Sequence, residues 1–448
     1  MNLPGPVCCK MPEIKLDQYQ DYYPISESSG IVMDFLRGTA VRVSHPRAPV
    51  VRRRDDPAAA ELDAAFLEKL QALPGRRVNA TIIPSYLCNL RCTYCYEGSK
   101  TGTTKRMTPD YADGIVTALK AVLEKHRADR LQLTLLGGEP LLAAHKPFYS
   151  ELFSGLAGLN CKIQVVCITN GVAVPEYLPE LMNWGVKDFQ ITIDGAESTH
   201  NARRKAAPGS DLNSFRAACG AIGLLLERNC SVSMRVNIDG DNLADLPVLE
   251  QAILANGWQG KPGFSAYLYP VSENGCNTDM CYAPEARLLG DVLDVLKNKC
   301  VSGLFRPRFH GLDFVDACLA SRPAAPRFNF CSASKNQYVF DPSGVYTCWW
   351  GVSNPVFSIG SYSAKGYSLD WGKAAVCHGR NIAEIPKCRK CRYKYICGAG
   401  CAYKALANTG ELLTGNCAEF EAIIGAYVRY RFADKKDGER INGTDRAE

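Results

Sequence analysis

The decisive stretch of this sequence is Cys88-Asn89-Leu90-Arg91-Cys92-Thr93-Tyr94-Cys95-Tyr96, which puts three cysteines on one predicted loop. An apolar run at 78–84 precedes it and predicts a β-strand, so the loop lies at the carboxyl end of that strand. A structural zinc site needs four ligands, whereas this loop supplies three. Three thiolates can instead hold a four-iron cluster and leave one iron open to a small molecule. A zinc loop is the alternative interpretation.

Strand and helix patterns alternate after this loop. Apolar runs predict six strands, at 78–84, 131–136, 163–168, 187–193, 231–238 and 263–269. Amphipathic segments predict helices at about 109–126, 142–158, 175–184, 212–229, 242–255 and 283–299. Six strand-helix units in series indicate an α/β fold, a partial (β/α)6 TIM-like barrel with active-site loops at the carboxyl ends of its strands.

We divide the chain into four parts: an N-terminal appendage (1–76), the barrel (77–300), a linker with a cysteine-rich domain (301–433) and a flexible tail (434–448). The appendage has strand-like runs at 30–36 and 40–43 and a helix near 57–73. In the third part the alternation stops, and Cys, Gly, Pro and aromatic residues dominate. Such a segment builds little conventional core, so we expect bound metal to hold it together.

Composition argues against several classes of protein. The net charge is +6 over 448 residues and the basic residues are scattered, which disfavours nucleic-acid binding. No apolar run reaches the roughly 18 residues of a membrane span, and residues 1–10 lack the apolar core of an export signal. We therefore expect a cytoplasmic protein. Thiols stay reduced in that compartment, so 21 cysteines favour metal ligation over disulfides.

Short motifs stand at the ends of the next three predicted strands: Gly137-Gly138-Glu139-Pro140, Thr169-Asn170-Gly171 and Ile191-Thr192-Ile193-Asp194-Gly195. Together with the cysteine triplet and the tyrosine after it, these motifs resemble the radical SAM family. Members of that family cleave S-adenosylmethionine (SAM) reductively at a 4Fe-4S cluster and release a 5'-deoxyadenosyl radical. The resemblance covers the whole barrel region.

This resemblance implies roles for individual residues. It implies that the cluster is held by Cys88, Cys92 and Cys95, and that SAM is bound by Tyr96, Gly137, Gly138, Glu139, Thr169, Asn170, Thr192 and Arg203. In the family an arginine pairs with the SAM carboxylate, a charge-assisted contact suited to guanidinium. Arg203 occupies its place, and the adjacent Arg204 is the alternative. The glycine turn and the Thr169 motif are also compatible with ordinary turns.

A second group of cysteines has the pattern Cys388-x2-Cys391-x5-Cys397-x3-Cys401, followed by Cys417 and preceded by Cys331, Gly344 and Cys348. This array resembles the seven-cysteine SPASM extension of radical SAM enzymes. The resemblance implies two auxiliary 4Fe-4S clusters, the nearer held by Cys331, Cys348 and Cys401 and the farther by Cys388, Cys391, Cys397 and Cys417. Cys318 is the candidate for a fourth ligand of the nearer cluster. The alternative is that one iron of this cluster has no protein ligand and binds substrate. A double zinc ribbon is the other interpretation of the array.

SPASM enzymes mostly modify peptides or proteins. The resemblance therefore implies a ribosomally synthesised precursor peptide as substrate and an external electron donor such as flavodoxin or ferredoxin. We expect hydrogen abstraction from the peptide and then an intramolecular crosslink, through a thioether, carbon–carbon or carbon–oxygen bond. The N-terminal appendage is a candidate for binding a leader peptide as an added strand, with a purely structural role as the alternative.

Two other functions are considered. A sulfatase maturase that makes formylglycine would have an Asp where this chain has Trp349, which argues against that branch. A non-catalytic iron-sulfur carrier would have lost the triplet or the SAM motifs, and both are intact. The catalytic residues stay unknown from the sequence; Asp341, Glu273 and Asp370 are only guesses for a general base.

Overall fold

The computed structural model describes residues 13–45, 48–72, 76–97, 104–271, 283–298 and 303–432. The tail predicted at 434–448 lies outside these residues. Within the described ranges, no helix is both long and apolar enough to cross a bilayer.

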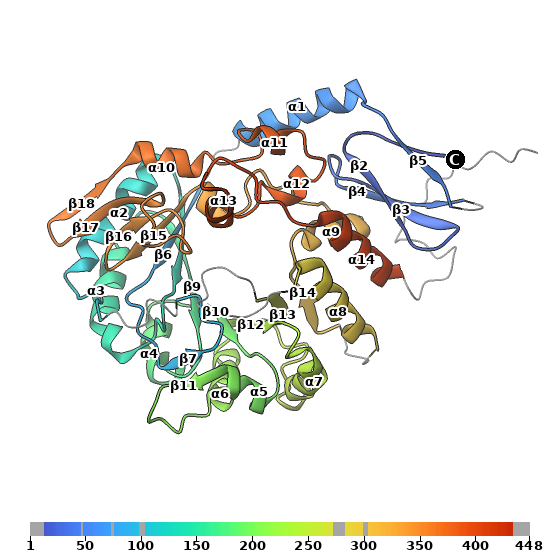
Figure 1. Ribbon diagram of the computed structural model, residues 1–448. Helices are drawn as coiled ribbons and strands as arrows, with labels where there is room; N and C mark the ends of the chain where they lie inside the picture. The colour runs from blue at the N-terminus through green and yellow to red at the C-terminus, as the bar shows by residue number, and fades with distance from the viewer. Residues whose placement is uncertain are drawn as a thin grey trace, which may run out of the picture.

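Six parallel strands form the centre of the structure, and they correspond to the six predicted ones: β6 (Arg77–Ile82), β8 (Arg130–Leu135), β9 (Lys162–Thr169), β10 (Asp188–Thr192), β12 (Ser231–Ile238) and β13 (Phe264–Pro270). The helices that accompany them are α2 (Tyr111–His126), α3 (Lys146–Leu156), α4 (Val174–Asn183), α6 (Ser214–Glu227), α7 (Leu246–Ala255) and α8 (Glu285–Asn298). Figure 1 shows the strands as a curved sheet with these helices on its outer side. The predicted α/β partial barrel is confirmed.

Local sequence explains why these segments fold as they do. In β8 the leucines at 131, 133 and 135 are buried while the residues between them are not, which is the alternation of a strand. Helix α6 starts where the side chain of Asn213 accepts a hydrogen bond from the Arg216 N–H at 3.0 Å, an N-cap. Pro175 lies in the first turn of α4, where a missing N–H costs nothing.

The sheet continues beyond the barrel, which was not predicted from the sequence. β15 (Gln337–Asp341) pairs in parallel with β6, and the antiparallel strands β16 (Gly344–Tyr346), β17 (Ser358–Ser363) and β18 (Gly366–Leu369) follow it. At the opposite edge β14 (Phe305–Pro307) pairs with β13. The sheet therefore has 11 strands in the order β14-β13-β12-β10-β9-β8-β6-β15-β16-β17-β18. The cysteine-rich segment thus adds strands directly to the barrel.

The N-terminal residues form two small sheets and a helix. β2 (Gln20–Pro24), β3 (Ser29–Asp34) and β4 (Thr39–Ser44) are antiparallel, β1 (Glu13–Leu16) pairs in parallel with β5 (Val50–Arg53), and α1 (Pro57–Ala72) follows. In Figure 1 these elements lie beside α9 (Leu312–Leu319), α12 (Lys394–Cys397) and α14 (Phe420–Phe432). The appendage therefore packs largely on the C-terminal part of the chain.

A buried ion pair joins the appendage to the cysteine-rich segment. Lys394 lies between Cys391 and Cys397, and its Nζ donates to Asp63 Oδ2 of α1 at 2.7 Å. The Tyr395 hydroxyl donates to the other oxygen of the same carboxylate. Because the Lys394 side chain is 0% exposed, its charge depends on Asp63 for compensation.

A second carboxylate of the appendage binds the same short segment. Asp21 of β2 accepts a hydrogen bond from the Tyr393 hydroxyl at 2.5 Å and pairs with Arg392 at 3.2 Å. Two separate elements of the appendage thus fix the backbone between two cysteines of the array.

We expect Asp63→Ala to lower the free energy of unfolding by about 3–5 kcal/mol, because it leaves the buried Lys394 charge without a partner. Replacing both partners with apolar residues, Asp63→Leu with Lys394→Met, should cost much less because no charge is then buried. Urea denaturation of the anaerobic protein measures both, and Glu61→Ala on the exposed side of α1 is the matched control. Equal losses from Asp63→Ala and Glu61→Ala would contradict this expectation.

Candidate active site

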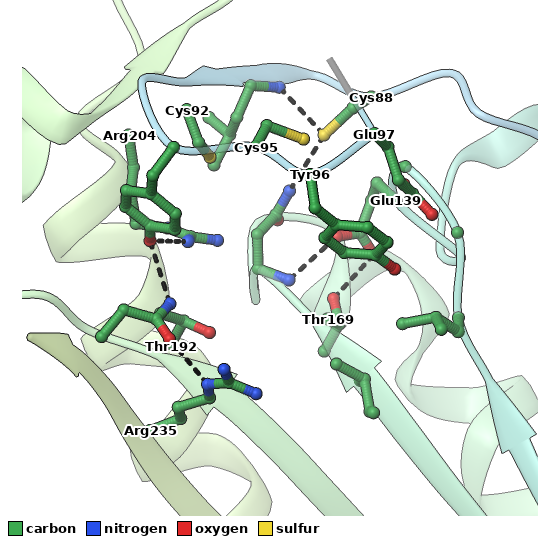
Figure 2. Close-up of a pocket in the computed structure, with 18 of the residues that line it drawn as sticks. Cys88, Cys92, Cys95, Tyr96, Glu97, Glu139, Thr169, Thr192, Arg204 and Arg235 are labelled. Atoms are coloured by element: carbon green, nitrogen blue, oxygen red, sulfur yellow. Dashed lines mark hydrogen bonds between the residues drawn. The ribbon is translucent and has the colours of Figure 1, made fainter. Parts of the chain in front are cut away.

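A cavity of about 380 Å³ opens at the carboxyl ends of the barrel strands. Small-molecule sites span about 300–1,000 Å³, so the volume is sufficient for a ligand. Its walls come from the cysteine loop, from the ends of five barrel strands and from Trp349 and Trp350 of the C-terminal segment. Figure 2 shows the three cysteines on one side, with Thr169, Thr192 and Arg235 across from them. Segments far apart in sequence therefore line one pocket.

The cysteine loop is tied to the barrel by a short two-stranded sheet. β7 (Leu90–Cys92) pairs antiparallel with β11 (Arg204–Ala206), and the N–H of Thr93 donates to the carbonyl of Arg203 at 2.9 Å. The side chain of Asn170 at the end of β9 donates to Asn89 Oδ1 at 2.7 Å. These bonds orient the loop so that all three predicted cluster cysteines face the cavity.

The thiols of this loop are strongly perturbed. Burial raises the pKa of Cys88 to about 12, and the neighbouring Glu139 carboxylate adds to the effect. Burial also raises the pKa of Cys95 to about 12 and that of Cys92, where Arg204 opposes the rise. Such thiols hold their protons at neutral pH unless a bound metal displaces them.

The donor set suits an iron-sulfur cluster better than a single metal ion. In the described part of the chain, no three His, Cys, Asp or Glu side chains gather around one point as a zinc ion requires. A four-iron cluster binds each thiolate through a different iron, so its ligands need not converge on one atom. Three thiols on one loop beside a cavity meet that requirement.

The glycine turn after β8 packs against the backbone that leads into the cysteine loop. Gly137 has a φ of 141°, which only glycine adopts readily. A Cβ on Gly138 would lie 2.3 Å from the carbonyl oxygen of Leu87, the residue before Cys88. Glycine at both positions therefore allows the turn to approach the loop.

Glu139 joins the ends of two barrel strands. Its Oε1 accepts from the Thr169 hydroxyl at 2.7 Å and from the Leu141 N–H at 3.0 Å, and its Oε2 accepts from the Asn170 N–H at 2.9 Å. Burial raises the pKa of this carboxyl, and the three hydrogen bonds oppose that rise. Glu139, Thr169 and Asn170 all line the cavity, and all three are among the positions for which the sequence analysis predicts SAM contacts.

The arginine that lines the cavity is Arg204, one residue after Arg203, which the sequence analysis favoured. Arg203, which was predicted to face SAM, ends α5 (Glu197–Arg203), and its Nη1 pairs with Asp239 at 2.8 Å. Arg204 instead lines the cavity and donates to the Tyr94 hydroxyl at 2.6 Å. Its buried Nε has no hydrogen-bond partner within the described residues. The helix ends between the two residues, so their side chains point in different directions.

A buried network supports Arg204 and was not anticipated. The Tyr94 hydroxyl donates to Asp194, which is 0% exposed, and also accepts from the Asn237 side chain at 3.2 Å. Thr192, another predicted SAM contact, lines the cavity beside this network. Tyr94 lies between two cysteines of the triplet, and the sequence analysis assigned it no role.

Aromatic side chains close another wall. The ring centroids of Tyr96 and Trp350 lie 4.4 Å apart. Trp349 and Trp350 directly follow Cys348, the second cysteine of the C-terminal array. The cavity beside the first cysteine group therefore extends to the backbone of the second.

The C-terminal cysteines form two groups, the first of which contains Cys331, Cys348 and Cys401. Burial raises the pKa of Cys331 to about 11, and the Cys401 thiol adds to it. The pKa of Cys348 is raised further, first by burial and then by the thiols of Cys331 and Cys401.

The second group contains Cys388, Cys391, Cys397 and Cys417. Burial raises the pKa of Cys397 to about 12, and the other three thiols add to the effect. The pKa of Cys388 is raised to about 11 by burial and by the thiols of Cys391 and Cys417. The two groups have the same members as the two sets named from the sequence.

Cys318 lies apart from both groups. It is 2% exposed within α9, and burial raises its pKa to about 12, with Asp34 as the charged neighbour that adds to it. Helix α9 packs on β4 of the appendage, so this cysteine faces the hydrophobic core. The structure does not bring it to the group of Cys331, for which it was the candidate fourth ligand.

Two of the three guesses for a general base, Asp341 and Asp370, do not line the cavity. Asp341 accepts from the Tyr86 hydroxyl at 2.9 Å and from backbone N–H groups of its own turn. Asp370 caps α10 (Trp371–His378) by accepting from the Lys373 N–H at 2.9 Å. Glu273 lies outside the described residues.

Comparison with known proteins identifies the barrel. Residues 82–252 match the Radical SAM superfamily. The AdoMet-dependent heme synthase of Methanosarcina barkeri is 24% identical over 353 residues, which cover 73% of this chain and 91% of that protein. The GTP 3',8-cyclase of Alkaliphilus oremlandii is 28% identical over 151 residues, 32% of this chain and 43% of that protein. The chain thus contains a radical SAM domain, and the superfamily uses a 4Fe-4S cluster and SAM.

Two solved structures share the fold over most of the chain. The anSMEcpe enzyme with bound AdoMet and the Cp18Cys peptide matches with a TM-score of 0.58 at 18% identity, over 80% of this chain and 96% of that one. Streptococcus suis SuiB bound to the precursor peptide SuiA matches with a TM-score of 0.52 at 12% identity, over 89% of this chain and 98% of that one.

We expect Arg204→Met to weaken SAM binding by about 10- to 100-fold, because a hydrogen bond to a charged group is worth about 1.5–3 kcal/mol. Arg203→Met is the matched control, because it removes the neighbouring guanidinium, which already pairs with Asp239. Equilibrium dialysis of SAM against the anaerobically reconstituted variants measures both affinities. A larger loss of SAM affinity in Arg203→Met than in Arg204→Met would indicate that Arg203, and not Arg204, contacts SAM.

Proposed function

We propose that this radical SAM enzyme forms an intramolecular crosslink in a ribosomally synthesised precursor peptide. One observation carries the proposal: a single cavity is lined both by the cysteine triplet and by the two tryptophans that follow Cys348. A substrate in this cavity would lie between the site of radical formation and the first group of C-terminal cysteines.

The residues around the cavity are suited to hold the cluster and SAM. The cluster would be bound by Cys88, Cys92 and Cys95, and SAM by Tyr96, Gly137, Gly138, Glu139, Thr169, Asn170, Thr192 and Arg204. When bound, they supply a 5'-deoxyadenosyl radical after one electron arrives from a donor such as flavodoxin or ferredoxin. The Nε of Arg204, which has no hydrogen-bond partner among the described residues, suits an anionic group of SAM.

The electron balance of a crosslink calls for an acceptor near the substrate. The 5'-deoxyadenosyl radical takes one hydrogen atom from the peptide and becomes 5'-deoxyadenosine, and the resulting carbon radical bonds to a second side chain. That side chain gives up a proton, and one electron must leave the product. We assign this electron to a 4Fe-4S cluster at Cys331, Cys348 and Cys401, with a second auxiliary cluster at Cys388, Cys391, Cys397 and Cys417.

A peptide substrate is supported by the N-terminal appendage as well as by the fold. SuiB, which shares the fold, was solved with its precursor peptide. β4 is an edge of its three-stranded sheet among the described residues, and Val41 on this strand is 46% exposed. A groove beside it is lined by residues of β1 and β4. An extended leader peptide could add to such an edge through backbone hydrogen bonds.

The sulfatase maturase is the second candidate, because anSMEcpe shares the fold. That branch uses a single residue of its substrate and leaves an aldehyde, whereas a crosslink joins two residues. Trp349, at the position after Cys348, supplies no carboxylate to the cavity. We therefore favour the crosslinking function.

We expect co-expression with a precursor peptide, sought among short open reading frames next to this gene, to yield a product lighter by two hydrogen atoms. Tandem mass spectrometry should show two residues that no longer separate on fragmentation. Cys88→Ala should abolish both this product and 5'-deoxyadenosine, because the cluster loses a ligand. Cys161→Ala, a cysteine ahead of β9 and away from the cavity, is the matched control and should keep full activity. An aldehyde at one residue, trapped by a hydrazide, would indicate formylglycine chemistry instead.

The cysteine assignments predict a specific pattern of iron content. In a background with the triplet changed to alanine, Cys348→Ala and Cys388→Ala should each lose about four irons per chain, because each disables one cluster. Cys318→Ala should lose none, since this residue lies in the core. Iron and acid-labile sulfide analysis measures this pattern. Equal iron loss from Cys318→Ala and Cys348→Ala would indicate that Cys318 is a cluster ligand after all.

A further inference from the structure

Arg380 is a fully buried guanidinium at the centre of the cysteine-rich segment, with 0% exposure. It follows α10 and belongs to neither cysteine group. It donates four hydrogen bonds, all to backbone carbonyls: Nε to Leu412 at 2.9 Å, Nη1 to Gly400 at 2.7 Å, and Nη2 to Ala399 at 2.8 Å and Thr414 at 2.6 Å. Every one of these acceptors is neutral.

The acceptors belong to backbone that carries cysteines of both groups. Residues 399–400 separate Cys397 of the second group from Cys401 of the first. Thr414 precedes Cys417 of the second group by three residues. One side chain thus holds two cysteine-bearing loops together.

The backbone around these bonds has no room to rearrange. The carbonyl of Arg380 accepts from the Asn329 side chain at 2.8 Å, two residues before Cys331. A Cβ on Gly398 would lie 2.5 Å from the backbone of Asn329, and one on Gly400 would lie 2.0 Å from the carbonyl oxygen of Asn416. The position of the guanidinium relative to both groups is therefore fixed by close packing.

The charge of Arg380 has no carboxylate partner among the described residues. A buried cation without a counter-ion is strongly unfavourable. Burial lowers the pKa of Arg380, and the groups that oppose this change are the thiolates of Cys388, Cys401, Cys331 and Cys397. These cysteines come from both groups, so clusters bound by them would place anionic ligands of both groups near the guanidinium.

We propose that Arg380 is a positioning residue shared by the two auxiliary clusters, whose fixed positive charge raises the reduction potential of both. The inference rests on the proposed function, because it requires both cysteine groups to hold clusters. A cluster becomes more negative when it is reduced, so a nearby cation favours the reduced form. Raised potentials would suit clusters that accept the electron left by crosslink formation.

The test uses the full chain with Cys88, Cys92 and Cys95 changed to alanine, so that only auxiliary clusters contribute to the spectrum. Redox titration followed by electron paramagnetic resonance gives their midpoint potentials. Arg380→Gln should make reduction of both clusters at least about tenfold less favourable, which is a shift of about 59 mV for a one-electron couple. Arg380→Lys keeps the charge and should stay close to the parent.

Arg389→Gln is the matched control. The Arg389 guanidinium also donates to a backbone carbonyl, that of Ala383 at 2.9 Å, and lies next to Cys388, but the residue is exposed to solvent. Solvent screens its charge, so its removal should leave both potentials unchanged.

Several outcomes would overturn the proposal. Unshifted potentials in an iron-replete Arg380→Gln protein would exclude the electrostatic role, and a shift at one cluster alone would exclude a shared one. Loss of iron from both Arg380→Gln and Arg380→Lys would indicate that Arg380 acts only through packing. If the parent background binds no iron, the proposed auxiliary clusters themselves are wrong, and this is seen before any Arg380 variant is measured.

Discussion

The parallel pairing of β15 with β6 sets the geometry on which the rest of the site depends. Phe340 lies opposite Ile82 in this pair, and the N–H of Ile83 donates to the Phe340 carbonyl at 2.9 Å. β6 leads into the cysteine triplet, while β15 leads through a hairpin to Cys348. Two cysteine groups separated by more than two hundred residues are therefore attached to neighbouring strands of one sheet. Backbone hydrogen bonds, rather than a flexible linker, fix their relative positions, and the cavity between them is a consequence of that pairing.

The barrel adds a second constraint, because its parallel strands end at a common edge. Buried polar side chains meet there, and each must be satisfied where water is excluded. Glu139 achieves this by accepting from the end of β9, and Asp194 by binding Tyr94 and the backbone of β12. The same bonds that satisfy these groups hold the strand ends and the cysteine loop in register. Fold stability and site geometry thus rest on the same contacts.

The sequence was sufficient for the barrel because its signals are local. Strand and helix periodicities, the spacing of the triplet and the glycine turn all depend on near neighbours in the chain, and the structure contains them as predicted. The contacts that were missed are set by tertiary structure. The assignment of Arg203 instead of Arg204 turned on where one short helix ends. Cys318 has the residue type of a ligand, yet its helix faces the core. No local pattern indicated that β15 joins the barrel, because its pairing with β6 is a tertiary contact.

The two cysteine-rich regions balance buried charge in different ways. Around the triplet, carboxylates and a guanidinium occur together, so charge is compensated within the protein before any cofactor binds. Around the C-terminal groups, Arg380 contacts only carbonyls, and thiolates are the anions nearest to it. Burial raises the pKa values of Cys331 and Cys388, which favours the neutral form of these two thiols when no metal is bound. If the proposed clusters form there, deprotonation of the cysteines would supply the guanidinium with counter-ions. The proposed clusters would therefore couple charge compensation in the C-terminal segment to cluster assembly, whereas the barrel has an apolar core and paired charges of its own.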